Sequence, residues 1–315
     1  MPIGPRLPQH PDQVVCLADW SPDEEFPFGP QGAKPKRIVV CPNPPPHPFL
    51  IGGHRYLFKE PTGTWAPQIW SEVIAYELSR DTGVPVPPAF VATGPGKGNP
   101  GVLIEFFYGH PQEPARRLID GIERLQAWGM QTNLQRGSLR DNIDICRLQK
   151  VPEWRRWWAQ TLAFDALIGN TDRHSQNWGF LATAGADGQL TYSMAPAFDN
   201  GTSLGFIIGE PQLDRFRRPA ALAKLIRNGR HHFGWTSGDV ESAQHARLCR
   251  RYADRFSSTK NIMREVTEVS DVRIDAIVSW CTRFGFPLPF TESRAQFVAA
   301  QLRGRRNALV AALGD

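Results

Sequence analysis

The chain changes character near residue 110, and this change restricts the folds it can adopt. Before that point, short apolar segments alternate with glycine- and proline-rich turns, a pattern typical of strands, at residues 13–17, 37–41, 55–59 and 102–107. A helical repeat at residues 68–82 interrupts them. After residue 110 helical periodicity dominates. We therefore expect an α+β fold with a small β-rich N-terminal lobe, residues 1–105, and a larger, mostly helical C-terminal lobe, residues 106–315.

Composition excludes several classes of protein. With 41% hydrophobic and 21% charged residues, the chain can bury a core and is not disordered. No apolar run approaches the roughly 20 residues of a membrane helix, and the N-terminus lacks the apolar segment of a signal peptide. The five cysteines lie far apart, without a CxxC pair, which argues against a disulfide framework and a structural zinc site. We expect a protein of a reducing cytoplasm with no membrane partner.

The net charge of +5 is mildly basic and suits an anionic ligand such as a nucleotide. The basic residues are dispersed and no helix-turn-helix pattern is evident, so direct binding of nucleic acid is not expected. We expect Arg303, Arg305 and Arg306 to form a solvated basic face of the last helix. His231 and His232 are expected to be a solvated pair.

The segment most informative about chemistry begins where an apolar helix ends. Residues 153–168 place Trp, Leu and Phe residues nearly all round a helix, which should therefore be buried. A polar loop at residues 169–178 follows, with Asp172 and, five residues later, Asn177. An Asp-Gly pair at 187–188 then predicts a hairpin turn, and a second Asp-containing turn lies beyond it.

Phosphoryl transfer requires groups of these kinds in this order. Asp172 would orient or deprotonate an acceptor hydroxyl. The amide oxygen of Asn177 and the carboxylate of Asp199, across the hairpin, would ligate Mg²⁺, which prefers oxygen ligands. The alternative is that Asp172 and Asn177 only cap the loop and that Asp199 only forms a turn. The combination of buried helix, polar loop, hairpin and Asp turn favours the phosphotransferase.

The 169–178 loop together with Phe198-Asp199 resembles the C-terminal kinase domain of the HipA-like serine/threonine kinases, bacterial proteins known chiefly as toxins of toxin–antitoxin modules. Its Asp-Arg-His-…-Asn portion is also similar to the phosphatidylinositol kinases, which share that fold. The resemblance implies a bilobal protein-kinase-like fold with ATP and Mg²⁺ between the lobes. It also implies transfer of the γ-phosphate to a serine or threonine hydroxyl of a protein substrate.

The resemblance extends into the N-terminal lobe. It implies that Lys59, in an apolar strand, contacts ATP phosphates and is held by Glu72, and that Gly32 and Lys36 belong to a phosphate-covering loop. A point cation suits polyphosphate, and glycines let backbone amides approach phosphates. The alternatives are a solvent-facing Lys59, a plain hairpin turn at the loop, and pairing of Lys59 with Glu77, which the spacing disfavours.

Three further assignments follow from the resemblance. At the junction of the lobes, backbone groups around Glu105 and Phe107 would contact adenine, while the Glu105 side chain alternatively only ends a strand. His174 is assigned to the catalytic loop, where it would brace the Asp172 backbone or bridge to Asp199. No His or Cys lies at ligand spacing from it, so His174 is not expected to bind a metal.

The chain also departs from the family pattern. About 28 residues precede the glycine-containing loop, so the chain resembles the short family members, which weakens the inference that an antitoxin partner docks there. Loop residues 29–36 contain no hydroxyl side chain, so switching by autophosphorylation of the loop is not expected. A kinase for a lipid or other small molecule, and a non-catalytic nucleotide-binding pseudokinase, stay as alternatives.

Overall fold

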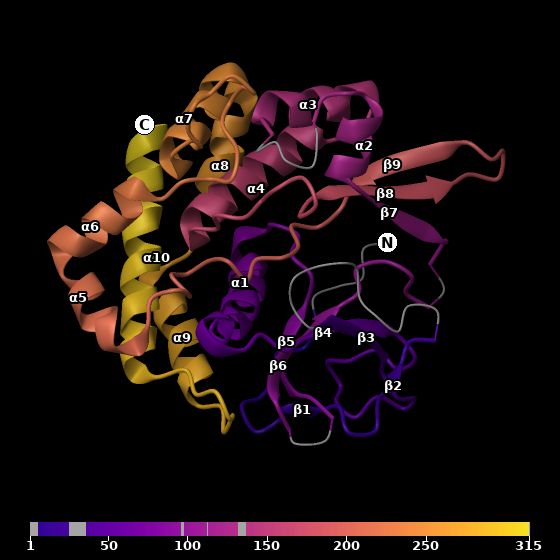
Figure 1. Cartoon of the computed structure of the whole chain (residues 1–315), viewed down its shortest axis with the longest axis vertical. Helices are drawn as coiled ribbons and strands as arrows, with labels where there is room; N and C mark the ends of the chain where they lie inside the picture. The colour runs from indigo at the N-terminus through magenta and orange to yellow at the C-terminus, as the bar shows by residue number, and fades with distance from the viewer. Residues whose placement is uncertain (1–5, 25–35, 96–97, 112, 132–136, 315) are drawn as a thin grey trace.

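The computed structural model describes residues 6–24, 36–95, 98–111, 113–131 and 137–314. They form two lobes: a six-stranded sheet with its helix in the lower part of Figure 1, and most of the other helices above and beside it. The two-lobed α+β architecture expected from the sequence is confirmed. None of the described helices is long and apolar enough to cross a membrane.

The N-terminal sheet consists of short strands. In order across the sheet they are β1 (Val15–Cys16), β5 (Ala89–Thr93), β6 (Pro100–Glu105), β4 (Arg55–Lys59), β3 (Lys36–Val40) and β2 (Ser21–Pro22), all antiparallel except the β1–β5 pair. In β4, Tyr56 and Phe58 are fully buried, and successive side chains of a strand point to opposite faces. Lys59 therefore points away from the apolar core.

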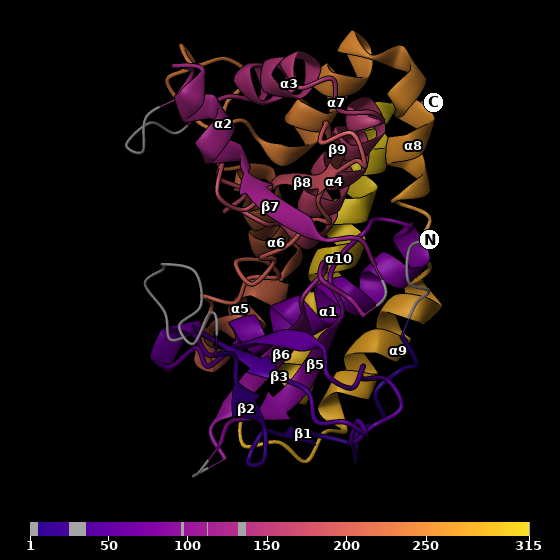
Figure 2. The same ribbon diagram turned by 90° about the vertical axis from the view of Figure 1, so that its right-hand side faces the viewer.

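Helix α1 (Gln68–Thr82) packs across β5 and β6, after the short 3₁₀ helix η1 (Gly63–Trp65). It ends at Gly83, whose φ of 65° lies in the left-handed region, where glycine is favoured as a helix terminator. The predicted helix over residues 68–82 is confirmed. Because α1 lies between the sheet and the C-terminal lobe (Figure 2), its side chains reach both.

The C-terminal lobe combines a second sheet with most of the helices. Strands β7 (Arg116–Asp120), β8 (Gly179–Ala184) and β9 (Leu190–Met194) are antiparallel, and the predicted Asp-Gly turn joins the last two. β7 shows that the chain after residue 110 is not purely helical. The helices are α2 (Gly121–Ala127), α3 (Leu139–Leu148), α4 (Trp154–Ile168), α5 (Leu213–Arg217), α6 (Pro219–Asn228), α7 (His245–Arg255), α8 (Lys260–Glu265), α9 (Asp271–Thr282) and α10 (Glu292–Leu313), with 3₁₀ helices η2 (Glu210–Gln212) and η3 (Ser257–Thr259).

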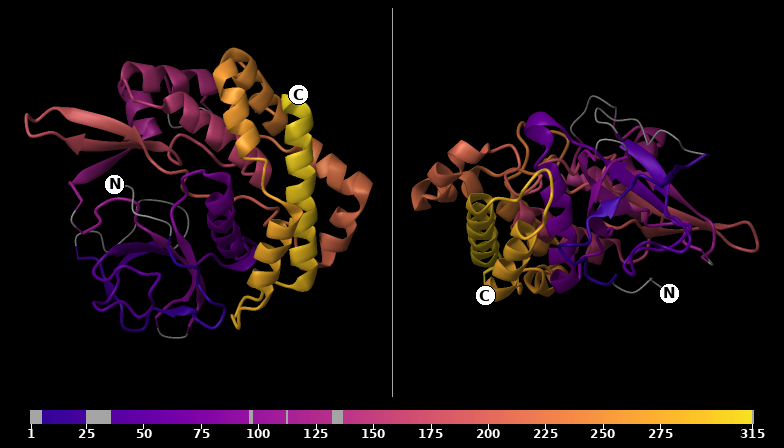
Figure 3. Two further views of the ribbon diagram at one scale, coloured as in Figure 1. Left: turned by 180° about the vertical axis from the view of Figure 1, so that it is seen from behind. Right: turned by 90° about the horizontal axis from the view of Figure 1, so that it is seen from below.

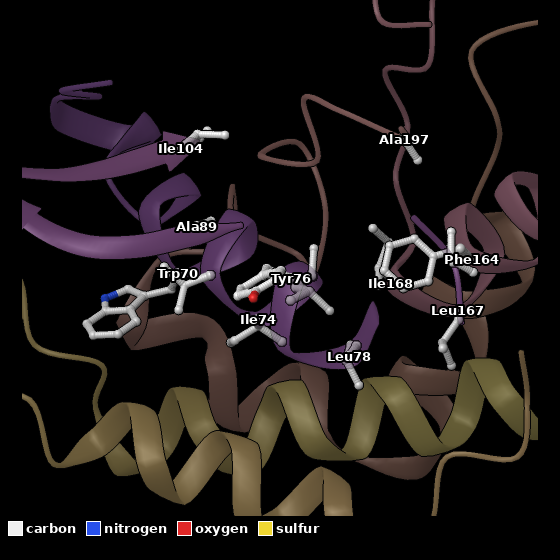
Figure 4. Packing of buried hydrophobic residues seen from close by; sticks show 14 of the residues in the cluster. Trp70, Ile74, Tyr76, Leu78, Ala89, Ile104, Phe164, Leu167, Ile168 and Ala197 are labelled. Carbon is white, nitrogen blue, oxygen red and sulfur yellow. The ribbon is translucent and has the colours of Figure 1, made fainter. Parts of the chain in front are cut away.

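Helix α4 is buried on nearly every side, as its sequence predicts. Trp154, Trp157 and Trp158 belong to the core, and Trp158 is fully buried. Phe164 and Leu167 of α4 lie in the same apolar cluster as the α1 residues Trp70, Ile74 and Leu78 (Figure 4). This cluster fixes the C-terminal end of α4, from which the polar loop starts.

The C-terminal helices support both lobes from behind. α9 contacts α1, and α10 contacts α4, α5, α6 and α7, so that the long α10 runs along the back of the molecule (Figure 3) and beside α9 in the side view (Figure 2). The indole of Trp70 in α1 packs against Phe284, Phe286 and Phe290, which lie between α9 and α10. The two lobes thus pack against the same C-terminal segment, residues 271–313.

Candidate active site

The polar loop after α4 is held by its own hydrogen bonds. Gly169 ends α4 with a φ of 69°, and the Asp172 amide donates to Asn170 Oδ1 at 3.1 Å. The Asn177 side-chain nitrogen donates to the Asp172 carbonyl at 2.8 Å. Because the amide nitrogen of Asn177 is used within the loop, its oxygen is the atom that remains for a cation.

Lys59, Glu72 and Asp199 meet where the lobes face each other. Lys59 Nζ lies 2.7 Å from Glu72 Oε1 and 2.9 Å from Asp199 Oδ1. Lys36 Nζ lies 4.0 Å from Asp199 Oδ2. Glu77, the alternative partner of Lys59, lies instead 3.2 Å from Arg273. Residues from four separate segments of the chain therefore form one cluster of charges, in which two lysines lie beside the Asp199 carboxylate.

Charge governs the protonation of this cluster. Burial opposes the charged form of Lys59, but Asp199 and Glu72 outweigh it and raise the pKa of the ammonium. Burial would likewise raise the pKa of Asp199, but Lys59 and Lys36 hold it well below its usual range. The carboxylate is thus ionised and the lysine charged near neutral pH. Asp199 also has a φ of 57°, an uncommon conformation that aspartate tolerates better than most residues.

Glu72 joins this cluster to the backbone of the C-terminal lobe. Its second oxygen, Oε2, accepts a hydrogen bond from the Asn200 amide at 3.0 Å. One buried carboxylate therefore holds both Lys59 of β4 and the turn that carries Asp199.

Asp172 lies between two histidines. Its Oδ1 is 3.9 Å from His174 Nε2 and 3.8 Å from His232 Nδ1, and the side chain is 41% exposed. His174 does not bond to Asp199 within the described residues. The expected solvated pair of His231 and His232 is wrong: His231 is buried with its Nε2 3.1 Å from Asp165, because the chain after α6 folds back onto the end of α4.

Sequence reasoning missed the residue that holds the site together, Arg173, which is fully buried. Its guanidinium donates to both oxygens of Asp165 in α4, at 3.1 and 2.8 Å, and to Asn200 Oδ1 at 2.6 Å. It also donates to the carbonyls of Asn177 and Phe198. Arg173 therefore ties α4, the polar loop and the Asp199 turn together. Its place beside Asp172 in the motif was the available signal.

Asp165 is the charge partner of this arginine. Burial would raise its pKa, but Arg173, with a contribution from His231, outweighs burial and holds the pKa of the carboxyl well below its usual range. The pair is fully buried on both sides. The pair stabilises the fold through several simultaneous hydrogen bonds, since a buried ion pair alone contributes little to the free energy of folding.

The side chain of Glu105 pairs with residues of the N-terminal lobe and its surroundings, whereas the ring of Phe107 lies beside the Asp199 turn. The Glu105 carboxylate accepts from Arg6 Nε at 2.6 Å and Nη2 at 2.8 Å and contacts His110 Nε2 at 2.9 Å, while its amide donates to the Pro88 carbonyl. These contacts give the Glu105 side chain a structural role at the end of β6. The Phe107 ring stacks on Phe198 at 5.4 Å, directly before Asp199. Gly32 lies outside the described residues.

The donor set fits the nucleotide and metal that the resemblance implies. Asp199 and Asn177 supply carboxylate and amide oxygens, the kind of ligand that Mg²⁺ takes. Lys59 and Lys36 place two ammonium groups on the same carboxylate, an arrangement that suits a polyphosphate. Asp199 is 31% exposed and therefore accessible.

His245 adds a pH-dependent element behind the loop. Its Nε2 donates to the Asn170 carbonyl at 2.7 Å, while burial, then the charge of Arg305, lower its pKa to about 3. A histidine with a lowered pKa takes up its proton mainly on unfolding, so it removes stability as pH falls below its unfolded pKa of about 6.5. The loss levels off only below the folded pKa.

We therefore expect His245→Gln, which keeps a donor but does not titrate, to flatten the pH dependence of stability. The free energy of unfolding of the wild type should drop by about 1.6 kcal/mol more than that of the variant between pH 6.5 and pH 5. Urea unfolding at several pH values measures this, with the exposed His10→Gln as control. Equal pH dependence in all three proteins would contradict the prediction.

Comparisons with known proteins agree with this geometry. The family model described as "HipA-like C-terminal domain" matches residues 28–272. No curated protein sequence matches the chain. Among solved structures, the Helicobacter pylori proinflammatory kinase CtkA is similar with a TM-score of 0.70 at 16% identity, over 95% of this chain and 96% of that one.

Two weaker likenesses accompany it. Shewanella oneidensis MR-1 HipA, solved with HipB and operator DNA, gives a TM-score of 0.49 at 17% identity, over 92% of this chain and 67% of that chain. The Golgi casein kinase gives 0.38 at 10% identity, over 95% and 72%. The likeness to CtkA spans nearly the whole of both chains and shows a shared kinase-like fold.

Proposed function

The chain belongs to the family of the HipA-like C-terminal domain, and from this premise we propose that it is an ATP- and Mg²⁺-dependent serine/threonine protein kinase. The observation that carries the proposal is the cluster in which Lys59 contacts both Glu72, at 2.7 Å, and Asp199, at 2.9 Å. The cluster brings a carboxylate suited to a metal ion next to a lysine suited to phosphate, and phosphoryl transfer needs both groups at one site.

In this proposal the two lobes, residues 1–105 and 106–315, hold the nucleotide where they meet. Lys59 and Lys36 bind its phosphates, Glu72 keeps Lys59 in place, and Phe107 lies beside the base. Asp199 and Asn177 would hold Mg²⁺, which when bound neutralises phosphate charge and helps orient the transferred group. The catalytic effect of these residues is positioning and charge stabilisation.

Asp172 acts on the acceptor. Its exposed carboxylate accepts a hydrogen bond from a serine or threonine hydroxyl, orients its oxygen and takes its proton as the phosphoryl group is transferred. His174 and His232, both within 4 Å of that carboxylate, restrict its position. Arg173 prevents the loop from shifting relative to Asp199.

The biological setting of the proposal rests on the family. We propose that this kinase acts as the toxin of a toxin–antitoxin module, with an antitoxin as its protein partner. The cluster of charged residues is complete, and this favours an active enzyme over a pseudokinase.

The test is transfer of label from γ-labelled ATP with Mg²⁺, by the purified protein alone and in a lysate. We expect labelled protein with the wild type and a loss of about 100-fold or more with Asp172→Asn, which cannot take the hydroxyl proton. Asp187→Asn, in the exposed hairpin, is the matched control. ATP binding by Asp172→Asn should persist, because Asp172 does not contact Lys59.

The outcomes separate the alternatives. Full activity of a folded Asp172→Asn variant would remove the role assigned to Asp172. Binding of ATP without labelled protein would favour a lipid or other small-molecule acceptor. No ATP binding by the wild type would overturn the kinase proposal.

A further inference from the structure

A cavity of about 910 Å³ lies beside the polar loop that carries Asp172. Thr171, adjacent to Asp172 in the chain, and His232, 3.8 Å from its carboxylate, both line the cavity. Lys59, Lys36, Asn177 and Asp199 do not. The cavity is therefore next to the group that acts on the acceptor and separate from the groups assigned to the nucleotide.

One residue that lines this cavity is a buried arginine without an acidic partner among the described residues. Arg305 of α10 is only 6% exposed, and within the described part of the chain its guanidinium forms no ion pair and its Nε has no hydrogen-bond partner. Burial, with no compensating carboxylate, lowers its pKa to about 10. The predicted solvated face of Arg303, Arg305 and Arg306 is thus wrong for Arg305, because this position of α10 faces the end of α4.

Gln301 lies one helical turn before Arg305, and its side chain is likewise buried with polar atoms that lack hydrogen-bond partners. It is 1% exposed, and neither its amide nitrogen nor its amide oxygen has a partner among the described residues. Buried polar atoms left without partners cost about 1–3 kcal/mol each, so native structures rarely retain them. Two such side chains on one helix face, lining one cavity, indicate groups reserved for a ligand.

Glycines lie close to these two side chains. A Cβ at Gly169 would lie 2.4 Å from Arg305 Cζ, and one at Gly205 would lie 3.0 Å from Gln301 Nε2. At Gly205 the Cβ would come closer still, 2.8 Å, to the Phe297 ring, and the positive φ of both residues, 69° and 65°, favours glycine as well. Gly229 lines the cavity as well and lies against the same guanidinium.

A second cavity, of about 570 Å³, also meets Arg305, and its lining combines apolar side chains of α6 and α10 with Arg227, Gln244, His245 and Arg247. The first cavity adds the hydroxyls of Thr171 and Thr202, and it alone of the two is lined by His232. Gln301 and Arg305 both line the first cavity, whereas only Arg305 lines the second, and this pair of side chains together with the closeness to Asp172 identifies the first cavity as the place for an anionic ligand.

We propose that this cavity, here called the Arg305 cavity, binds the protein substrate, and that Arg305 and Gln301 bind an oxyanion group beside the acceptor hydroxyl. The group is a carboxylate of an acidic residue or a phosphate of an already phosphorylated one, since guanidinium binds both in a fork. The inference rests on the proposed function, because it takes the cavity as belonging to the acceptor.

The first experiment measures binding of inorganic phosphate, and of succinate as a carboxylate, by the shift in thermal midpoint over a concentration series. The wild type should be stabilised by at least one of the two. Arg305→Met should bind that anion about tenfold or more weakly, since it loses a charge-assisted contact. Its midpoint without ligand should stay equal or rise, because an unpaired buried charge has been removed.

Three variants complete this experiment. Arg303→Met is the matched control, on the same helix but paired with Asp271 and Asp275 at the surface, and should bind as the wild type does. Gln301→Leu should weaken binding without altering a charge. Lys59→Met should leave anion binding intact. Loss of binding in Lys59→Met with retention in Arg305→Met would place the anion at the nucleotide site and overturn the inference.

The second experiment uses labelled ATP and serine peptides that differ only in one flanking residue, glutamate, phosphoserine or glutamine. The wild type should have a kcat/KM for one of the acidic peptides about tenfold or more higher than for the glutamine peptide. Arg305→Met should lose this preference because its KM for the acidic peptide rises. An equal rate for all peptides, or an anion shift unchanged by Arg305→Met, would overturn the inference. If the wild type binds anions through Arg305 but no ATP, the kinase proposal fails while the anion site stands.

Discussion

Asp199→Asn is expected to lower phosphoryl transfer by about a thousandfold or more. The change removes the negative charge that Lys59 contacts at 2.9 Å and Lys36 at 4.0 Å, and it replaces an anionic metal ligand by a neutral one. A bound metal supplies several kcal/mol of charge stabilisation, and each 1.4 kcal/mol or so is a factor of ten in rate. A loss of about 4 kcal/mol or more with the carboxylate corresponds to at least three such factors.

The measurement is the rate of label transfer at saturating ATP and Mg²⁺, beside a direct assay of Mg²⁺-dependent ATP binding. The Asn variant should stay folded, because Lys59 keeps its contact with Glu72 at 2.7 Å. Asp187→Asn again serves as the charge-matched control. A folded Asp199→Asn protein that transfers phosphate at the normal rate would refute the metal-binding role.

Arg173→Met is expected to destabilise the fold by about 3–5 kcal/mol, because it leaves a buried charge without its partner. Arg173 and Asp165 are both fully buried, and the methionine cannot replace the hydrogen bonds to Asn200, Asn177 and Phe198. The loss therefore reaches the Asp199 turn as well as α4, and activity should fall with stability.

Urea unfolding at neutral and acidic pH tests this prediction in two ways. In the wild type the lowered pKa of Asp165 contributes stability above about pH 4 that is lost as pH falls. The gap between wild type and variant should therefore narrow below pH 4. Arg117→Met, whose arginine is 73% exposed in a surface pair, should cost no more than about 0.5 kcal/mol. A loss for Arg173→Met as small as this would contradict the prediction.

Much of the polar loop after α4 could be predicted because its signal is local. Asp172 and Asn177 lie on one short loop, and the hairpin before Asp199 has a recognisable Asp-Gly turn. The pairing of Lys59 with Glu72 rather than Glu77 followed from spacing along a helix, and the structure has this pairing at 2.7 Å. The strand around residues 55–59 is correct to the residue.

Long-range burial of charge could not be predicted. Arg305 and Arg303 are two residues apart on α10, yet one faces the end of α4 and the other pairs with Asp275 at the surface. Helical periodicity assigns faces, but only the neighbouring elements decide which face is covered. Arg173 and Asp165 are only eight residues apart, but their burial depends on Asn200 and His231, which come from later segments of the chain. β7 escaped prediction because its pairing with β8 spans about 60 residues.

The packing of both lobes against the C-terminal segment, residues 271–313, has a practical consequence for producing this protein. The family model stops at residue 272, at the start of α9, but Trp70 in the N-terminal lobe is enclosed by Phe284, Phe286 and Phe290 from beyond that point. A fragment cut at the limit of sequence similarity would expose this aromatic surface together with the faces of α4 and α7 that α10 covers, and large apolar patches promote aggregation. Residue 272 therefore marks where similarity is detected and not where the folding unit ends.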